Sequence, residues 1–260
     1  MREPKISVVI NTYNAERFLD QVLAAVKGFD EILICDMEST DRTRAIATEY
    51  GCRIVTFPKR DYVSAEPART FAIQQAGCPW VLVVDADEVV TPALRQYLYE
   101  HISHEGCAEG LWIPRKNYFM GRFMHCHYPD YLLRFFVKDG TEWPAHVHTF
   151  PTVRGRLEYL PGKRQELALI HLANDGVADI LRKTNLYTEN EVEKKAGRHY
   201  GWAALLWRPF FRFFKAYILK GGFRDGKAGF VRAQLEAVYQ VVMLGKILEH
   251  NDARGAGTIG

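Results

Sequence analysis

The sequence contains few cysteines, no long apolar run and little net charge, and each of these shortages excludes a class of protein. Its five cysteines are odd in number and form no Cys-x-x-Cys pair, so we expect reduced, packed thiols and no thiolate metal site. No stretch has the roughly 18 consecutive apolar residues that a membrane-spanning helix needs. Such a protein meets a membrane only by lying on its surface. The cysteines are Cys35, Cys52, Cys78, Cys107 and Cys126.

The net charge of +3 is too small for a general nucleic-acid-binding protein, but the charge is unevenly distributed along the chain. Between Arg198 and Arg232 there are eight Lys or Arg residues and one acidic residue, Asp225, which gives this stretch +7 and leaves −4 for the remainder. This asymmetry predicts one basic face that meets anionic lipid or an anionic acceptor. The N-terminal residues lack the pattern of a signal peptide, so we expect a cytoplasmic protein.

The first hundred residues alternate four times between a β-branched, apolar segment and a segment with helical spacing of apolar residues. Four consecutive β-α units predict a parallel, doubly wound sheet. The apolar run from Val81 to Val84 agrees, because strands covered by helices on both faces are apolar throughout. Ser39-Thr40-Asp41 and Thr91-Pro92 are typical of helix starts. The expected strands are 5–10, 31–35, 52–57 and 80–84, and the expected helices are 15–26, 64–75 and those beginning at 41 and 91.

From residue 106 to about 170, short aromatic and β-branched runs at 111–113, 131–137 and 167–170 predict a mixed or antiparallel continuation of the sheet. Beyond Gly176 the helical spacing returns, and we expect helices to about 195, at 202–219 and at 227–249. These patterns divide the chain into a catalytic domain at 1–175, with halves 1–105 and 106–175, a helical extension at 176–252 and a flexible tail at 253–260.

The apolar run that ends at Val84 is followed by three carboxylates, those of Asp85, Asp87 and Glu88. In open α/β sheets the ligand site lies at the carboxyl ends of the strands, so these acids are expected to project into it. Alternation along an extended chain aims Asp85 and Asp87 in the same direction. Neighbouring carboxylates favour a hard divalent cation such as Mg²⁺ or Mn²⁺. The alternative is that the acids cap the helix that begins near Thr91.

Several sequence motifs, and the order in which they follow one another, resemble those of the family 2 inverting glycosyltransferases of the GT-A fold. In the first hundred residues they are Val8-Val9-Ile10-Asn11-Thr12-Tyr13-Asn14, Asp36 with Ser39-Thr40-Asp41-Arg42-Thr43, Ala68-Arg69, and the acidic trio. The remainder is similar to the subgroup that includes lipopolysaccharide core glucosyltransferases, through Pro114-Arg115, Asn117, Gly121, Tyr128-Pro129-Asp130, Arg134-Phe135-Phe136, Val147-His148 and Gly222-Phe223-Arg224-Asp225-Gly226.

The resemblance implies a nucleotide-sugar site at the strand ends, built from six residues. Thr12 and Tyr13 would line the nucleotide pocket, Asp36 would accept a hydrogen bond from the base, Arg69 would lie near base or phosphate, and Asp85 and Asp87 would hold ribose and metal.

Two of these roles have plainer alternatives, and two departures from the family pattern affect the site. Asp36 alternatively caps its own loop, and Arg69 alternatively is a solvated helix residue. Met37-Glu38 stand where the family commonly has small residues, which predicts a narrower base pocket. Thr149 stands where the subgroup often has an acid after Val-His, which weakens a base role for that position.

An inverting transfer needs a group that takes the proton from the attacking hydroxyl. Asp130 is the first candidate, because it lies in a Pro-fixed turn before an apolar strand and matches an acidic position of the family. Glu142 is the second. The alternative for Asp130 is a turn acid paired with Arg134.

Five histidines gather in the middle of the sequence and raise the alternative of a zinc site. If they lie on strands, His125 with His127 and His146 with His148 each share one strand face. Core or acceptor-binding histidines are commoner than zinc ligands. His171 is expected instead to complete the divalent-metal shell from a neighbouring strand.

The segment from Leu205 to Lys220 alternates aromatic residues with cations and is typical of a helix that lies in the membrane interface. The alternative is a helix packed on the catalytic domain. The expected apolar face is Leu206, Phe210, Phe213, Phe214 and Tyr217, and the expected basic face is Arg208, Arg212 and Lys215.

The function expected from these features is inverting transfer of a sugar, from a nucleoside diphosphate sugar such as a UDP-sugar, to a lipid-linked acceptor such as lipopolysaccharide core at the inner membrane surface. A homo-oligomer is a further expectation. One alternative is a nucleotidyltransferase, but the segment from Asn11 to Arg17 lacks its Gly-rich phosphate loop. The other is a non-catalytic membrane scaffold, which the intact acids Asp36, Asp85 and Asp87 disfavour.

Overall fold

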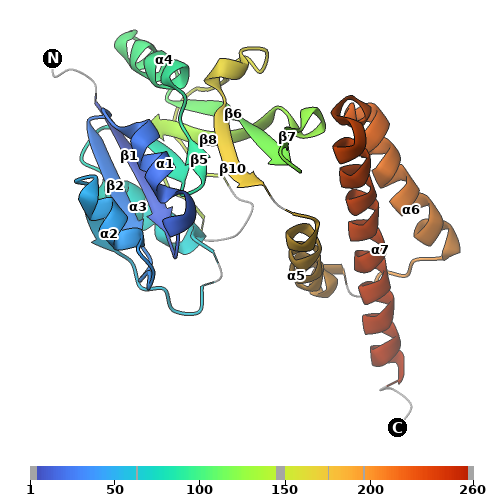
Figure 1. The fold of residues 1–260 in the computed structure, drawn as a ribbon. Coiled ribbons are helices and arrows are strands. Elements are labelled where there is room, and N and C mark those ends of the chain that lie inside the picture. The colour runs from blue at the N-terminus through green and yellow to red at the C-terminus, as the bar shows by residue number, and fades with distance from the viewer. Residues whose placement is uncertain (1–4, 63, 145–149, 175, 196, 257–260) are drawn as a thin grey trace. The chain divides into compact units, whose positions relative to one another are not determined.

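The computed structural model describes residues 5–62, 64–144, 150–174, 176–195 and 197–256 (Figure 1). The chain forms two compact units. Unit 1 comprises the described residues of Met1–Lys116 and Pro129–Leu172, and unit 2 those of Asn117–Tyr128 and Ala173–Gly260. Residues Asn117–Tyr128 therefore interrupt the range 1–175 that the sequence assigns to a catalytic domain, and that division of the chain stays a prediction.

Unit 1 is built on a mixed sheet with the strand order β3-β2-β1-β4-β8-β6-β10-β5, and β9 lies beside β6 (Figure 1). Strands β3, β2, β1 and β4 are parallel, while β8 runs antiparallel to β4 and β6. The expected doubly wound sheet with a mixed continuation is confirmed. The strands are β1 (Ile6–Thr12), β2 (Glu31–Asp36), β3 (Arg53–Thr56), β4 (Trp80–Asp85), β5 (Glu88–Val89), β6 (Gly110–Phe119), β8 (Asp130–Val137), β9 (Leu157–Tyr159) and β10 (Leu169–Asn174).

Two apolar clusters bury the two faces of this sheet. Val8 and Ile10 of β1 belong to one cluster and Val9 to the other, as period-two alternation requires. The first cluster includes buried residues of α1 (Glu16–Val26) and α4 (Pro92–Ser103), and the second includes residues of α3 (Glu66–Gln75). The remaining helix of unit 1 is α2 (Thr43–Glu49).

The register of the central strands sets which side chains meet at their carboxyl ends. Asn11 of β1 lies opposite Cys35 of β2 and Asp85 of β4. Thr12 lies opposite Asp36, the last residue of β2. The side chains expected at the site therefore come from adjacent strand ends, as a parallel sheet dictates.

Unit 2 is mainly helical. Its helices are α5 (Val177–Lys195), α6 (Trp202–Phe214), a π-helical segment (Lys215–Leu219) and α7 (Gly226–Ala256), with short 3-10 turns at Gly222–Asp225 and His125–His127. In Figure 1, α6 lies along α7. The tail expected at 253–260 begins inside α7, which reaches Ala256, and residues 257–260 lie outside the described chain. Among the described residues, no helix has a segment long and apolar enough to cross a membrane.

Hydrogen bonds and close packing join the turn at His125–His127 to the turn at Gly222–Asp225 in unit 2. The buried carboxylate of Asp225 accepts hydrogen bonds from the backbone N of His125 (2.9 Å) and of Cys126 (3.1 Å). Gly229 lies against the same turn, where a Cβ would come within 1.9 Å of the Gly222 carbonyl oxygen. The Gly-Gly-Phe-Arg-Asp-Gly motif therefore fixes the turn His125–His127, which follows β7 (Arg122–Phe123), to the start of α7.

Candidate active site

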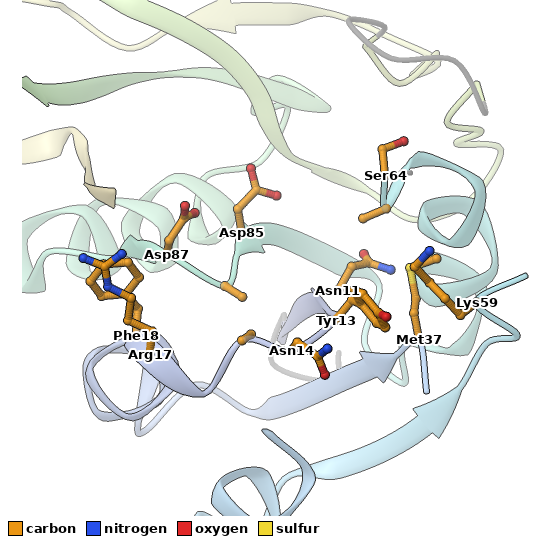
Figure 2. A pocket seen from close by; sticks show the side chains of 13 residues that line it. Asn11, Tyr13, Asn14, Arg17, Phe18, Met37, Lys59, Ser64, Asp85 and Asp87 are labelled. Carbon is orange, nitrogen blue, oxygen red and sulfur yellow. The ribbon is translucent and has the colours of Figure 1, made fainter. Parts of the chain in front are cut away.

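A pocket of about 450 Å³ opens at the carboxyl ends of β1 and β4. Figure 2 shows that Asp85, the last residue of β4, and Asp87, in the turn that follows, point to the same side of the chain. Met37, which is expected from the sequence to narrow a base pocket, contributes to the wall of this pocket. The lining residues are Asn11, Tyr13, Asn14, Ala15, Arg17, Phe18, Met37, Lys59, Ser64, Ala65, Asp85, Ala86 and Asp87.

The loops after β1 and β2 brace one another at the edge of this pocket. Three consecutive backbone N–H groups at the start of α1 donate to side chains of the second loop. Of the side chains expected to cap α2, Asp41 also accepts a hydrogen bond from the backbone N of Thr43, the first residue of that helix, at 2.9 Å. The start of α1 is therefore committed to this loop and presents no phosphate loop of the nucleotidyltransferase type. The pairs are Asn14 N with Ser39 Oγ (3.0 Å), Ala15 N with Thr43 Oγ1 (2.8 Å) and Glu16 N with Asp41 Oδ2 (3.1 Å).

Asp36 is fully buried beneath the pocket, and its carboxylate accepts several hydrogen bonds from its own surroundings. Thr12 Oγ1 donates to it at 3.1 Å, Ser39 Oγ at 2.6 Å and Arg44 Nη1 at 3.0 Å. These contacts support the alternative in which Asp36 organises its loop. Of the residues expected to line the nucleotide pocket, Tyr13 lies in the wall and Thr12 is buried with Asp36.

Asp85 lies between two buried guanidinium groups. Arg69 Nη2 donates to its Oδ1 at 2.7 Å, and Arg134 Nη2 donates to its Oδ2. Arg69 is only 6% exposed, so its interpretation as a solvated helix residue is wrong. Burial alone would raise the pKa of Asp85, but the two arginines outweigh it and hold that pKa well below its usual range.

The ion pairs continue from Asp85 to Asp130. Arg115 donates to Glu88 from Nη1 (3.0 Å) and to Asp130 from Nη2 (2.8 Å) and Nε (3.1 Å). Burial alone would lower the pKa of Arg115, and Glu88 and Asp130 raise it instead. Asp130 is thus paired with Arg115, whereas the plainer alternative for Asp130 expects Arg134.

Glu88 does not project into the pocket with the two aspartates. It is fully buried, and its carboxylate accepts a hydrogen bond from the backbone N of Asp85 at 3.1 Å. The carboxylates of this segment do not cap α4 either. The cap is Thr91, whose hydroxyl oxygen accepts a hydrogen bond from the backbone N of Leu94 at 3.1 Å. Glu88 therefore holds the turn that presents Asp85 and Asp87.

The sequence did not single out Asn11 and Trp143 as site residues. The Trp143 ring lies against the guanidinium groups of Arg69 (4.6 Å) and Arg134 (5.6 Å), a cation–π arrangement. Within the described chain, both polar atoms of the Asn11 side chain are buried without a hydrogen-bond partner, as are Nε and Nη1 of the two arginines. Such groups point to a ligand. For Asn11, the available signal was its place just before the end of the first strand.

Asp87 and His171 form the pair best suited to hold a metal. His171 Nε2 lies 3.2 Å from Asp87 Oδ2, because β10 pairs with β5 and places His171 opposite Glu88. A carboxylate and an imidazole fit one side of a divalent cation, with donor phosphate and water oxygens as the natural remainder. In the part of the chain that is described, no cluster of three or more His, Cys, Asp or Glu residues forms a complete site.

The other candidate residues lie elsewhere. Glu142 is exposed and pairs through its backbone with Thr152. His125 and His127 lie in a 3-10 turn, not on a strand, so the strand-face zinc arrangement is wrong for them. His125 Nδ1 lies 2.7 Å from Asp225 Oδ1. His146 and His148 lie outside the described residues, as does Thr149.

A mixed sheet of this order, with C-terminal helices, is the fold of the GT-A class of glycosyltransferases. The model of "Glycosyl transferase family 2" matches residues 7–157, more than half of the chain, and the protein therefore belongs to this family.

Two relatives match nearly the whole chain. The lipopolysaccharide core biosynthesis glycosyltransferase LpsC of Rhizobium meliloti is 25% identical over 260 residues, covering 95% of this chain and 93% of its own. An uncharacterised glycosyltransferase of Rickettsia felis is 25% identical over 264 residues, covering 94% and 90%. Among solved structures, the mannosyltransferase PcManGT of Pyrobaculum calidifontis, in complex with GDP-Man and Mn²⁺, matches with a TM-score of 0.54 at 13% identity, covering 95% of this chain and 88% of its own.

Proposed function

We propose that this glycosyltransferase moves a sugar from a UDP-sugar to a lipid-linked glycan such as lipopolysaccharide core, with inversion at the anomeric carbon and with Mn²⁺ or Mg²⁺ as cofactor. The observation that carries the proposal is the pocket at the ends of β1 and β4, where Tyr13, Asn11, Asp85 and Asp87 meet. The nearly full-length similarity to LpsC supports a surface glycan as the acceptor.

The donor occupies the pocket with its base against Tyr13, whose ring is 48% exposed. Lys59 lies 4.7 Å from the centre of that ring and supplies a positive charge at the same wall. Asn11 offers a buried amide donor and acceptor to the ribose or the diphosphate. Asp36 acts indirectly, because it fixes the loop that carries Met37.

Asp87 and His171 would hold the metal, which supplies positive charge to the departing diphosphate. Asp85 has a different task. Arg69 and Arg134 donate hydrogen bonds to its carboxylate and fix the position of the turn. The exposed part of the carboxylate accepts hydrogen bonds from hydroxyl groups of the donor. PcManGT, which shares the fold, is recorded with a nucleotide sugar and Mn²⁺ together.

Asp130 takes the proton from the attacking acceptor hydroxyl. Its side chain is 37% exposed, and Arg115 links it to Glu88 beneath the donor pocket. The guanidinium of Arg115 orients the carboxylate, and the exposed part of the Asp130 side chain faces the solvent from which an acceptor approaches.

A transfer assay with purified enzyme, a panel of UDP-sugars and GDP-mannose, and lipid-linked core oligosaccharide tests the proposal. We expect Mn²⁺-dependent transfer from one UDP-sugar and a product whose anomeric configuration, measured by NMR, is opposite to that of the donor. Retention of configuration contradicts the inverting mechanism. Transfer from GDP-mannose alone would show that the donor is a guanosine diphosphate sugar and not a UDP-sugar. Transfer of the nucleotidyl group instead of the sugar supports the nucleotidyltransferase alternative. A protein that binds vesicles but neither nucleotide nor metal supports the scaffold alternative.

A further inference from the structure

Helix α6 presents a row of large apolar side chains to solvent. Leu206, Phe210 and Phe214 recur every four residues and are 74%, 57% and 38% exposed. Trp207 and Phe211 follow on the same side and are 61% and 42% exposed. We call these five residues the α6 apolar face. A monomer in water gains nothing from exposing such a row, so the face is expected to have an occupant.

This face differs from the one expected from the sequence. Phe213 and Tyr217 were assigned to it, but their rings pack against Phe230 of α7 at 5.5 Å and 5.6 Å. Arg212 was assigned to the basic side and instead lies 3.5 Å from Gln240 of α7. These three side chains hold α6 on α7, and the α6 apolar face is what this packing leaves uncovered.

Further exposed apolar residues of unit 2 lie on α7, at the start of α6 and in the segment between the two helices. Val238 and Val241, three residues apart on α7, are 37% and 55% exposed, and Trp202 at the start of α6 is 83% exposed. The turn between the two helices adds three further exposed apolar side chains. They are Ile218, Leu219 and Phe223.

The stretch of chain from Arg198 to Arg232 carries exposed cations and no exposed acidic residue. Arg208, Lys215 and Lys220 are exposed. The one acid between Arg198 and Arg232 is Asp225, whose side chain is fully buried and hydrogen-bonded to His125. The surface therefore carries positive charge together with aromatic rings.

We propose that the α6 apolar face and the cations beside it bind an anionic lipid bilayer, with α6 lying in the plane of the interface. Tryptophan rings favour the boundary between headgroups and acyl chains, and cations favour lipid phosphates. A second copy of the chain fits less well, because face-to-face pairing would bring together two stretches of +7 each. The binding surface lies wholly in unit 2, so its test is independent of the donor pocket.

Co-sedimentation of the full-length protein with vesicles tests the proposal. Wild-type protein is expected to bind vesicles of phosphatidylglycerol and phosphatidylcholine at low salt and to bind phosphatidylcholine alone at least tenfold more weakly. The combined substitution Arg208→Glu, Lys215→Glu and Lys220→Glu is expected to weaken binding at least tenfold, since each cation contributes about 1 kcal/mol at an anionic surface. Trp207→Ser with Phe210→Ser is expected to weaken it similarly and to reduce quenching of tryptophan fluorescence by brominated lipid.

Matched controls separate this surface from general effects. Leu181→Ser with Leu186→Ser changes apolar residues of α5 that are 42% and 50% exposed, and we expect wild-type vesicle binding. A second control changes three exposed cations of unit 1 and is expected to retain at least half of the wild-type vesicle binding. It combines Lys27→Glu, Arg42→Glu and Lys163→Glu. Unchanged melting temperatures exclude unfolding as the cause. Wild-type protein that stays in solution with anionic vesicles overturns the proposal, as does equal loss in the controls. A dimer that the Trp207 and Phe210 substitutions dissociate, without vesicle binding, assigns the face to a second copy.

Discussion

Asp85 and Asp87 are two residues apart and lie in different electrostatic environments. Arg69 and Arg134 bind both carboxylate oxygens of Asp85, whereas Asp87 meets the ring of His171. A carboxylate that already neutralises two buried cations is a poor metal ligand, since the metal would have to displace at least one of them. In the proposed function the metal role therefore falls to Asp87.

Replacing Asp87 with Ala is expected to abolish sugar transfer and Mn²⁺-dependent binding of UDP. The side chain is 34% exposed at the pocket wall, so its loss is expected to change the free energy of unfolding by only about 0.5 kcal/mol. Calorimetric titration of UDP with and without Mn²⁺ measures the effect. The matched control is Asp61→Ala, an exposed carboxylate outside the pocket lining. Wild-type Mn²⁺-dependent affinity in Asp87→Ala contradicts the assignment.

Replacing Asp130 with Asn is expected to lower kcat about a hundredfold or more, because general-base catalysis contributes about that much. The amide keeps an oxygen for the hydrogen bonds from Arg115, so the affinity for UDP is expected to stay near the wild-type value. Initial rates at saturating donor measure kcat. Glu142→Gln is the control, and we expect its kcat to be near the wild-type value. The reverse result, with loss only in Glu142→Gln, moves the proton transfer to Glu142.

Four strands (β4, β5, β6 and β8) and helix α3 supply the ion pairs of the candidate site, and the elements depend on the pairs for their mutual packing. Arg134→Met would leave Asp85 and Glu88 buried with fewer cations. Removing one partner of a buried pair costs about 3–5 kcal/mol, so we expect a loss of that size in urea unfolding. Arg156→Met removes a pair with Glu158 in which both side chains are exposed, and we expect at most about 1 kcal/mol. Similar losses in the two variants would contradict a structural role for the buried pairs.

The turn before α7 is expected to make unit 2 sensitive to acid. Burial alone would raise the pKa of Asp225, but hydrogen bonds from His125 and Cys126 lower it below its ordinary value of about 3.9. A carboxyl whose pKa is lower in the folded state stabilises the fold above its unfolded-state pKa, and this contribution disappears as pH falls through the folded-state pKa. We therefore expect the melting temperature to fall steeply below about pH 4, where the unfolded chain takes up the proton first.

Asp225→Asn is expected to lower the melting temperature at neutral pH, because hydrogen bonds to a buried charge contribute about 1.5–3 kcal/mol. It should also flatten the dependence on pH. Asp179→Asn is the matched control, since Asp179 has a lowered pKa through Arg182 but lies at the exposed start of α5. An Asp225→Asn protein with wild-type melting temperature and acid sensitivity contradicts this account.

The order of the longer strands and of the α-helices could be predicted, because apolar spacing and polar helix starts are local signals, whereas the short strands β5, β7 and β9 were not predicted. The ion pairs could not be predicted either. Asp85 meets Arg69, 16 residues away, and Arg134, 49 residues away, and only the register of β4 with β8 brings the second one close. For the same reason the sequence paired Asp130 with Arg134 and placed Phe213 and Tyr217 on the exposed side of α6. Those assignments depend on packing between distant segments.

The most direct test of the whole account is thermal unfolding of the wild-type protein and of Asp87→Ala, each with UDP, Mn²⁺, both or neither. A ligand that binds only the folded state at 100 times its Kd adds about 2.7 kcal/mol to the free energy of unfolding. For a chain of this size that corresponds to about 5 °C or more. We expect this rise for wild-type protein only when UDP and Mn²⁺ are present together, and no rise for Asp87→Ala. No rise in the wild-type protein, or an equal rise in the variant, would contradict a metal-assisted nucleotide-sugar site at the ends of β1 and β4.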